Sequence, residues 1–130
     1  MAAAHVIHFE VTGKDGKALQ SFYSKVFGWE PQEVDMGPGG IYTLLNRPGT
    51  TNNEGKPRGA GGIFKAPEGV KFAAWVAYVA VPDADAIVTK AQKFGAKIQM
   101  PPTDIPGIGR FAAFEDSIGA HLAILAPPKA

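Results

Sequence analysis

Cysteine is absent from the chain. Without cysteine, neither a disulfide nor a zinc site built from thiolates can form. An excess of charge of one sign is also missing, because 13 basic and 12 acidic residues leave a net charge of +1. This balance provides no electrostatic argument for binding nucleic acid or an anionic membrane surface. We therefore expect neither of them as a partner.

Long hydrophobic runs are missing as well. No apolar stretch of the sequence approaches the roughly 20 residues that a membrane-spanning helix needs. The first five residues, Met1–His5, lack the basic segment and the apolar core of a signal peptide. These two absences predict a cytoplasmic protein.

The composition is that of a folded domain rich in turns. The chain has 130 residues, of which 45% are hydrophobic, so it can bury the core of one domain spanning residues 1–130. Its 16 glycines and 11 prolines favour short strands joined by tight turns.

The sequence contains an internal repeat that covers nearly its whole length. Each copy has an apolar or alternating strand, a turn, an amphipathic helix that ends at Phe-Gly, and then short strand-like segments. The strands are expected at Val6–Val11 and Trp75–Val81, and the helices at Lys17–Phe27 and Asp83–Phe94. Thr12 and Asp15 are both candidates to cap the first helix. The repeat predicts an α+β fold of two βαβββ modules, at about residues 4–65 and 70–127.

The sequence also predicts the conformation of three further segments. Asn46–Arg58 is polar and contains glycine and proline, so we expect a hairpin connection there without core packing. Pro101–Gly109 reads as a loop. The glycines of Gly59–Phe64 indicate a strand with a close backbone approach or an open space beside it.

With this repeat and these segments, the sequence resembles the vicinal oxygen chelate superfamily, which includes glyoxalase I, bleomycin-resistance proteins and extradiol dioxygenases. The matching motifs are His8-Phe9-Glu10, Phe22–Trp29, Gly61-Gly62, Trp75–Asp83, Phe94-Gly95, Pro101-Pro102, Gly109–Ala112 and Glu115–Ala120. The resemblance implies curved sheets around a cavity that holds a small organic molecule. It also implies a homodimer, because members of the superfamily commonly pair.

The resemblance further implies four positions for metal ligands, one on the first and one on the last strand of each module. In this chain they correspond to His8, to the Gly61–Phe64 segment, to Val76 and to Ala123. Only His8 can bind a metal, and a catalytic metal usually takes three protein ligands. We therefore predict no metal cofactor.

An alternative is that the ligands have moved. His121 shares a strand face with Ala123, and Glu10 shares one with His8, because side chains two apart on a strand lie on one face. His8, Glu10 and His121 could then hold one divalent ion such as Zn, Ni, Mn or Fe. Otherwise His8 and His121 are polar residues of the cavity wall.

Glu10 and Tyr78 are the candidates for catalysis. A carboxylate within a half-buried strand can act as a general base, although it can equally form a structural pair, for example with Arg110. Tyr78 lies on the same strand face as Val76 and can donate to a ligand or satisfy a hydrogen bond in the core. The predicted ligand-binding residues are His8, Glu10, Tyr78 and His121.

Two functions follow from these patterns. The first is a binding or sequestering protein that holds a small organic molecule without the usual metal site. The second is an enzyme of the superfamily, a lyase, isomerase or dioxygenase, that uses either the relocated ligands or Glu10 with Tyr78.

Overall fold

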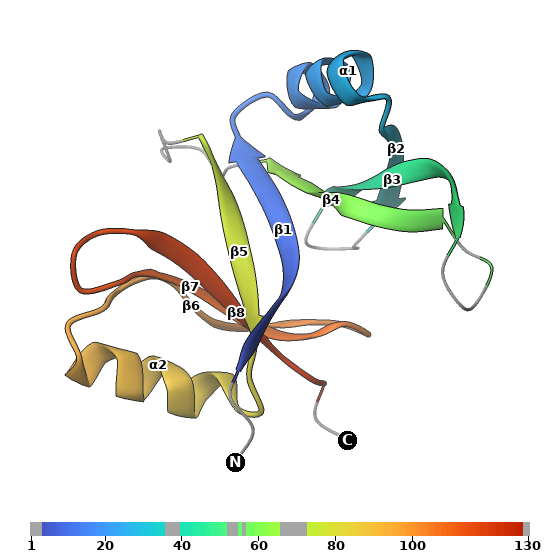
Figure 1. Ribbon diagram of the computed structural model, residues 1–130. Helices are drawn as coiled ribbons and strands as arrows, with labels where there is room; N and C mark the ends of the chain where they lie inside the picture. Colours follow the sequence, from blue (N-terminus) through green and yellow to red (C-terminus); the bar gives the residue numbers. More distant parts are fainter. Residues whose placement is uncertain (1–3, 36–39, 52–54, 56, 66–72, 129–130) are drawn as a thin grey trace. The chain divides into compact units, whose positions relative to one another are not determined.

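The structure is a computed structural model that describes residues 4–35, 40–51, 55, 57–65 and 73–128. The elements occur in the order βαβββ twice (Figure 1). They are β1 (His5–Gly13), α1 (Gly16–Phe27), β2 (Glu30–Asp35), β3 (Ile41–Thr51), β4 (Pro57–Lys65), β5 (Ala74–Ala80), α2 (Ala84–Lys93), β6 (Lys97–Ile105), β7 (Gly109–Glu115) and β8 (His121–Ala126). The predicted α+β class and the two βαβββ modules are confirmed.

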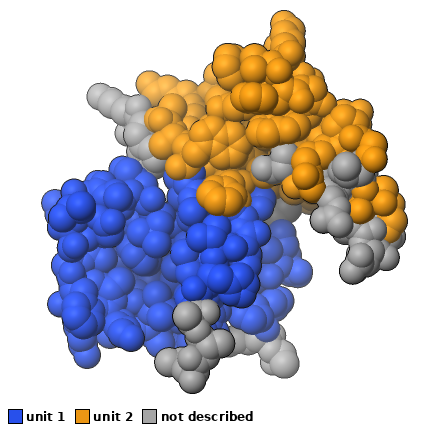
Figure 2. Space-filling model, in the orientation of Figure 1, with its two compact units in different colours: residues 1–8, 76–130 blue, residues 9–75 orange. Residues whose placement is uncertain are grey.

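The chain forms two compact units, shown in different colours in Figure 2. Unit 2 comprises Phe9–Trp75, and unit 1 comprises Met1–His8 together with Val76–Ala130. The first residues of β1 therefore belong to the same unit as the second module. In unit 2 the strand order is β2-β3-β4-β1, and in unit 1 it is β5-β8-β7-β6. In each unit the first strand of the module pairs with the last in parallel, and the other pairs are antiparallel.

The helices begin and end where the local sequence predicts. Asp15 caps α1 by accepting a hydrogen bond from the Ala18 amide at 3.0 Å, and Asp83 does the same for Ala86 at 3.1 Å on α2. Of the two predicted caps for α1, Asp15 is therefore the correct one. Gly28 ends α1 in the left-handed conformation, with φ of 73°. Neither helix has the length and apolar character needed to cross a membrane among the described residues.

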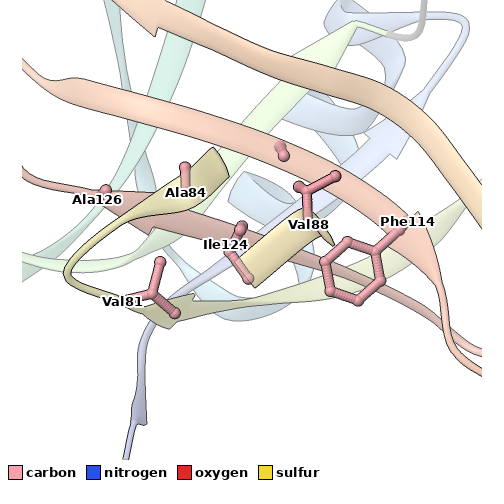
Figure 3. Close-up of a cluster of buried hydrophobic side chains, with 7 residues drawn as sticks. Val81, Ala84, Val88, Phe114, Ile124 and Ala126 are labelled. Atoms are coloured by element: carbon pink, nitrogen blue, oxygen red, sulfur yellow. The ribbon is translucent and has the colours of Figure 1, made fainter. Parts of the chain in front are cut away.

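Each helix covers one face of its own sheet. In unit 1, α2 packs on β6, β7 and β8 over a buried cluster that Figure 3 shows. Its members are Val81, Ala84, Val88, Ala112, Phe114, Ile124 and Ala126. In unit 2, Val11, Leu45 and Ile63 are buried with Leu19 and Tyr23 of α1 packed against them. Side chains of alternate residues therefore lie on the opposite face of each sheet, away from the helix.

Two of the predicted connections were wrong in extent. Within Asn46–Arg58, β3 continues to Thr51 and β4 already begins at Pro57, with Arg47 paired to Arg58. Strand pairing uses backbone groups, so polar side chains do not prevent it. Residues 52–54 and 56 lie outside the described part of the chain.

Similarly, β6 continues through Pro101 and Pro102 to Ile105, where a loop was expected. β6 is the last strand of its order, and the register shifts between Met100 and Thr103, where the prolines lack an amide donor. An edge strand tolerates proline because one side of its backbone needs no partner strand.

Candidate functional site

Two predicted site residues meet in unit 1. The rings of His8 on β1 and Tyr78 on β5 lie edge to face, with centroids 5.6 Å apart and planes at 73°. Both side chains are half-buried. This geometry is typical of a favourable aromatic contact, and it fixes the orientation of the imidazole relative to the phenol.

Burial affects the charge of His8. Desolvation lowers the pKa of its imidazole below the ordinary value of 6.5, because an apolar environment disfavours the charged form. His8 is therefore neutral at pH 7. A neutral imidazole has one nitrogen that donates a hydrogen bond and one that accepts, so it can bind a ligand as either partner.

His121, the third predicted residue of unit 1, is held by polar neighbours on β6 and β7. Its Nδ1 lies 2.9 Å from the Oε1 of Gln99, and its Nε2 lies 3.7 Å from the Oε1 of Glu115. Glu115 is directly opposite His121 in the antiparallel pair of β7 and β8. The amide oxygen of Gln99 thus accepts a hydrogen bond from the imidazole, and the carboxylate of Glu115 lies near its other nitrogen.

These side chains lie on the sheet face opposite α2. Tyr78 is paired with Ala123 across β5 and β8, so the two residues share a face. His121 is two residues before Ala123 and lies on the same face, whereas Ile124 and Ala126 pack toward α2. Tyr78 and His121 are therefore neighbours on one sheet surface, and Ala123 lies between them. We call His8, Tyr78, Gln99, Glu115 and His121 the polar face of unit 1.

Three of the four positions that the resemblance implies for metal ligands carry no side chain that can bind a metal. Val76 is 7% exposed and Ala123 is 1% exposed, and both side chains are hydrocarbon. The Gly61–Phe64 segment likewise offers no ligand side chain. Among the residues that the structure describes, no three His, Cys, Asp or Glu side chains gather as a metal-binding group. The absence of a metal cofactor nevertheless stays a prediction, to be tested by titration.

Glu10, the fourth predicted residue, lies in unit 2. It is 5% exposed and is paired with Gly62 across β1 and β4. The hydroxyl of Tyr42 lies over Gly62, because a Cβ built on this glycine would be 1.8 Å from the phenol oxygen. The glycine-rich strand was predicted to have a close backbone approach or an open space beside it. At Gly61 the approach is by backbone, since an added Cβ would lie 2.8 Å from the carbonyl oxygen of Phe9, whereas at Gly62 it is by the Tyr42 side chain.

Arg110, the suggested partner of Glu10, is bound elsewhere. Its guanidinium donates to both carboxylate oxygens of Asp85, at 2.7 and 3.1 Å, and to Asp104 at 3.0 Å. The hydrogen bonds from Arg110 to Asp85 and then to Asp104 raise the pKa of the guanidinium. This arrangement ties α2 to β6 and β7 in unit 1.

Two hollows occur among the described residues, and neither is lined by a residue of the polar face. One, of about 420 Å³, is in unit 2 beside the start of α1 and is lined by Lys14, Lys17 and Lys65 among others. The other, of about 800 Å³, is in unit 1 and is lined mainly by apolar residues such as Ile7, Ile87 and Ile108. His8, Tyr78 and His121 are not among the described residues that line either hollow.

The sequence did not predict Gln99, Glu115 or Tyr42 as site residues. Gln99 and Glu115 become neighbours of His121 through strand register, which a single strand's pattern does not reveal. The glycines of the adjacent Gly59–Phe64 strand did indicate that another group approaches it, because glycine inside a strand often marks a close approach. That group is Tyr42.

The comparisons with known proteins agree with the fold. The model of the Glyoxalase/Bleomycin resistance protein/Dioxygenase superfamily matches residues 5–124. The chain is 34% identical over 111 residues to "Putative glyoxylase CFP32" of Mycobacterium bovis, covering 85% of this chain and 41% of that protein. It is 32% identical over 127 residues to the anthracycline biosynthesis protein DnrV of Streptomyces peucetius, covering 89% and 44%. The chain therefore spans less than half the length of these curated relatives.

Solved structures share the fold at low sequence identity. A variant of Streptomyces coelicolor methylmalonyl-CoA epimerase, in complex with 2-nitronate-propionyl-CoA, has a TM-score of 0.61 at 12% identity over 98% of this chain and 100% of that one. The Mycobacterium tuberculosis methylmalonyl-CoA epimerase has a TM-score of 0.55 at 14% identity, over 95% and 88%. At these identities the likeness concerns the fold alone.

The lowered pKa of His8 predicts a dependence of stability on pH. Below pH 6.5 the unfolded chain takes up a proton that buried His8 resists, so the free energy of unfolding falls as the pH drops and levels off below the folded-state pKa. His8→Gln should remove this part of the dependence. Urea unfolding from about pH 8 to about pH 5 measures it.

The matched control is His5→Gln, since His5 is exposed and its replacement should leave the pH dependence as in the wild type. If wild type and His8→Gln lost stability equally as the pH fell below 6.5, burial would not control the charge of this imidazole.

Proposed function

The chain belongs to the glyoxalase/bleomycin resistance protein/dioxygenase superfamily, and from this premise we propose that it is a cytoplasmic protein that binds a small organic molecule on the polar face of unit 1. The observation that carries the proposal is the grouping of His8, Tyr78 and His121 on the sheet surface that α2 does not cover. A ligand cavity shared by the two modules stays a prediction from the sequence.

The chemistry of this surface favours hydrogen bonding to a ligand with an apolar body. A neutral imidazole, a phenol hydroxyl and an oriented second imidazole supply the polar contacts, while the half-buried ring of Tyr78 offers hydrocarbon. Small-molecule sites commonly combine a few fixed polar groups with apolar walls in this way. No metal is needed for such recognition.

An enzyme is the second candidate. His8 is held neutral beside Tyr78, and a neutral imidazole in a fixed position can accept a proton from a bound molecule. Relatives named as a glyoxylase and as a biosynthesis protein are compatible with catalysis. A metal-dependent lyase, isomerase or dioxygenase would need the relocated ligands His8, Glu10 and His121.

We expect a screen of small carbonyl- and hydroxyl-bearing fragments to find ligands of the polar face. In protein labelled at tyrosine and histidine carbons, such fragments should shift the NMR signals of Tyr78, His8 and His121. Loss of one neutral hydrogen bond costs about 1 kcal/mol, so Tyr78→Phe should weaken binding about fivefold. Glu10→Gln tests the sequence prediction that Glu10 matters more to binding than either histidine alone.

His5→Ala is the control variant, because His5 lies outside the polar face and should not alter the affinity. Fragments that left Tyr78 and His121 unmoved and, in a second sample labelled at isoleucine, shifted Ile87 and Ile108, which line the apolar hollow of unit 1, would place the binding site elsewhere and overturn the proposal.

We expect calorimetric titration of Zn, Ni, Mn or Fe(II) to show no tight binding. The physical reason is that Val76 and Ala123, at two of the superfamily's ligand positions, carry no chelating atom, and each lost ligand weakens a chelate. Sub-micromolar binding that His8→Ala, Glu10→Gln and His121→Ala each abolished, and that His5→Ala retained, would establish the relocated metal site instead.

We also propose that the protein is a homodimer. Three hydrophobic side chains on α1, those of Phe22, Val26 and Phe27, are each more than half exposed, at 55%, 54% and 58%. Exposed apolar groups of this size favour a partner surface. Light scattering at micromolar concentration should give twice the 13.7 kDa of one chain, and a mass of one chain at all concentrations would refute the dimer.

A further inference from the structure

Tyr42 of β3 lies across the neighbouring strand β4 at Gly62. A Cβ added to this glycine would lie 1.8 Å from the phenol oxygen and 2.4 Å from the Cζ of Tyr42, so no larger residue fits beneath the ring as it stands. Tyr42 is half-buried. The end of the ring that approaches Gly62 most closely is the hydroxyl.

The strand on the other side of Gly62 carries Glu10. Glu10 is paired with Gly62, and Leu44 is paired with Gly62 from the opposite side, so these three residues form one row across β1, β4 and β3. Tyr42 is two residues before Leu44 and shares its face. Adjacent strands are about 4.8 Å apart, a distance that a glutamate side chain spans. The Tyr42 hydroxyl therefore lies on the same sheet face as Glu10 and within its reach.

The internal repeat provides a comparison for this arrangement. Glu10 and Tyr78 each precede the capping aspartate of the following helix, Asp15 or Asp83, by five residues. In unit 1 the corresponding row is Tyr78, Ala123 and Ala113, and Phe111 occupies the place of Tyr42. Thus the first module has the phenol of Tyr42 with Gly62 beneath it. The second module has the phenyl ring of Phe111, with Ala123 at the position that corresponds to Gly62.

We propose that Tyr42 is a positioning residue that donates a hydrogen bond from its hydroxyl to the carboxylate of Glu10. Gly62 is the residue that permits it, because the absent Cβ leaves the path of the phenol open. Core packing does not require this approach, since Val11, Leu45 and Ile63 form the core on the opposite face of the sheet.

The pair gives Glu10 a defined orientation toward a ligand of its own unit, unit 2. The hydrogen bond would hold the carboxylate in one orientation, with its remaining lone pairs available. Within unit 2, it would accept from an amino or hydroxyl group of a small molecule, and not from a second carboxylate. The ligand class is therefore a small organic molecule that carries a hydrogen-bond donor.

The test uses the three tyrosines of the chain as probes without any ligand. With tyrosine labelled at Cζ, the protein should give three NMR signals, which Tyr→Phe variants assign. Glu10→Gln should move the signal of Tyr42 and leave those of Tyr23 and Tyr78 in place. Gly62→Ala should move it as well, because the new Cβ displaces the hydroxyl. In glutamate-labelled protein, Tyr42→Phe should move the carboxyl signal of Glu10.

Gly59→Ala is the matched control, since Gly59 is on the same strand and its nearest neighbouring atom would be 3.9 Å from the added Cβ. A Tyr42 signal that ignored Glu10→Gln, or a Glu10 signal that ignored Tyr42→Phe, would overturn the proposal even if Gly62→Ala failed to fold. Because no ligand is used, this outcome is separate from failure of the fragment screen, which would contradict the proposed function alone.

Discussion

The register of β8 is the constraint on which the rest of unit 1 depends. β8 lies between β5 and β7, paired in parallel with one and antiparallel with the other. In this register Ile124 and Ala126 face α2 and His121 and Ala123 face the opposite way. A shift of one residue would exchange the two faces. His121 would then enter a hydrocarbon core without Gln99 and Glu115, and the unit would lose its polar face and its core together.

The parts of the fold that depend on nearby residues could be predicted from the sequence. Asp15 and Asp83 each cap a helix by accepting a hydrogen bond from the amide three residues later. Gly28 ends a helix through its own backbone conformation. These interactions are local, so their residues appear as patterns in the chain. The two βαβββ modules follow because the same local pattern occurs twice.

The parts that depend on strand pairing could not be predicted in the same way. Gln99 and His121 are 22 positions apart and meet only because β6, β7 and β8 align as they do. The predicted extents of β3 and β6 were wrong for a related reason. Backbone pairing continues through polar residues in β3 and through prolines in β6, although such residues by themselves favour loops. The alternation of side chains along a strand assigned His8, Glu10, Tyr78 and His121 to strand faces. It did not predict which residues of other strands they would contact.

The two modules have one topology and different chemistry at equivalent positions. Where the first module has Glu10 paired with Gly62, the second has Tyr78 paired with Ala123. A duplicated metal site would require ligand side chains at such positions in both halves, and hydrocarbon at Val76 and Ala123 removes that symmetry. Unit 1 has a phenol close to an imidazole, and the hydrogen bond that we propose would give unit 2 a phenol close to a carboxylate. Such pairs recognise the placement of donors and acceptors on a molecule, because a hydrogen bond depends on direction. The two modules therefore differ in side-chain chemistry at positions that their shared topology makes equivalent.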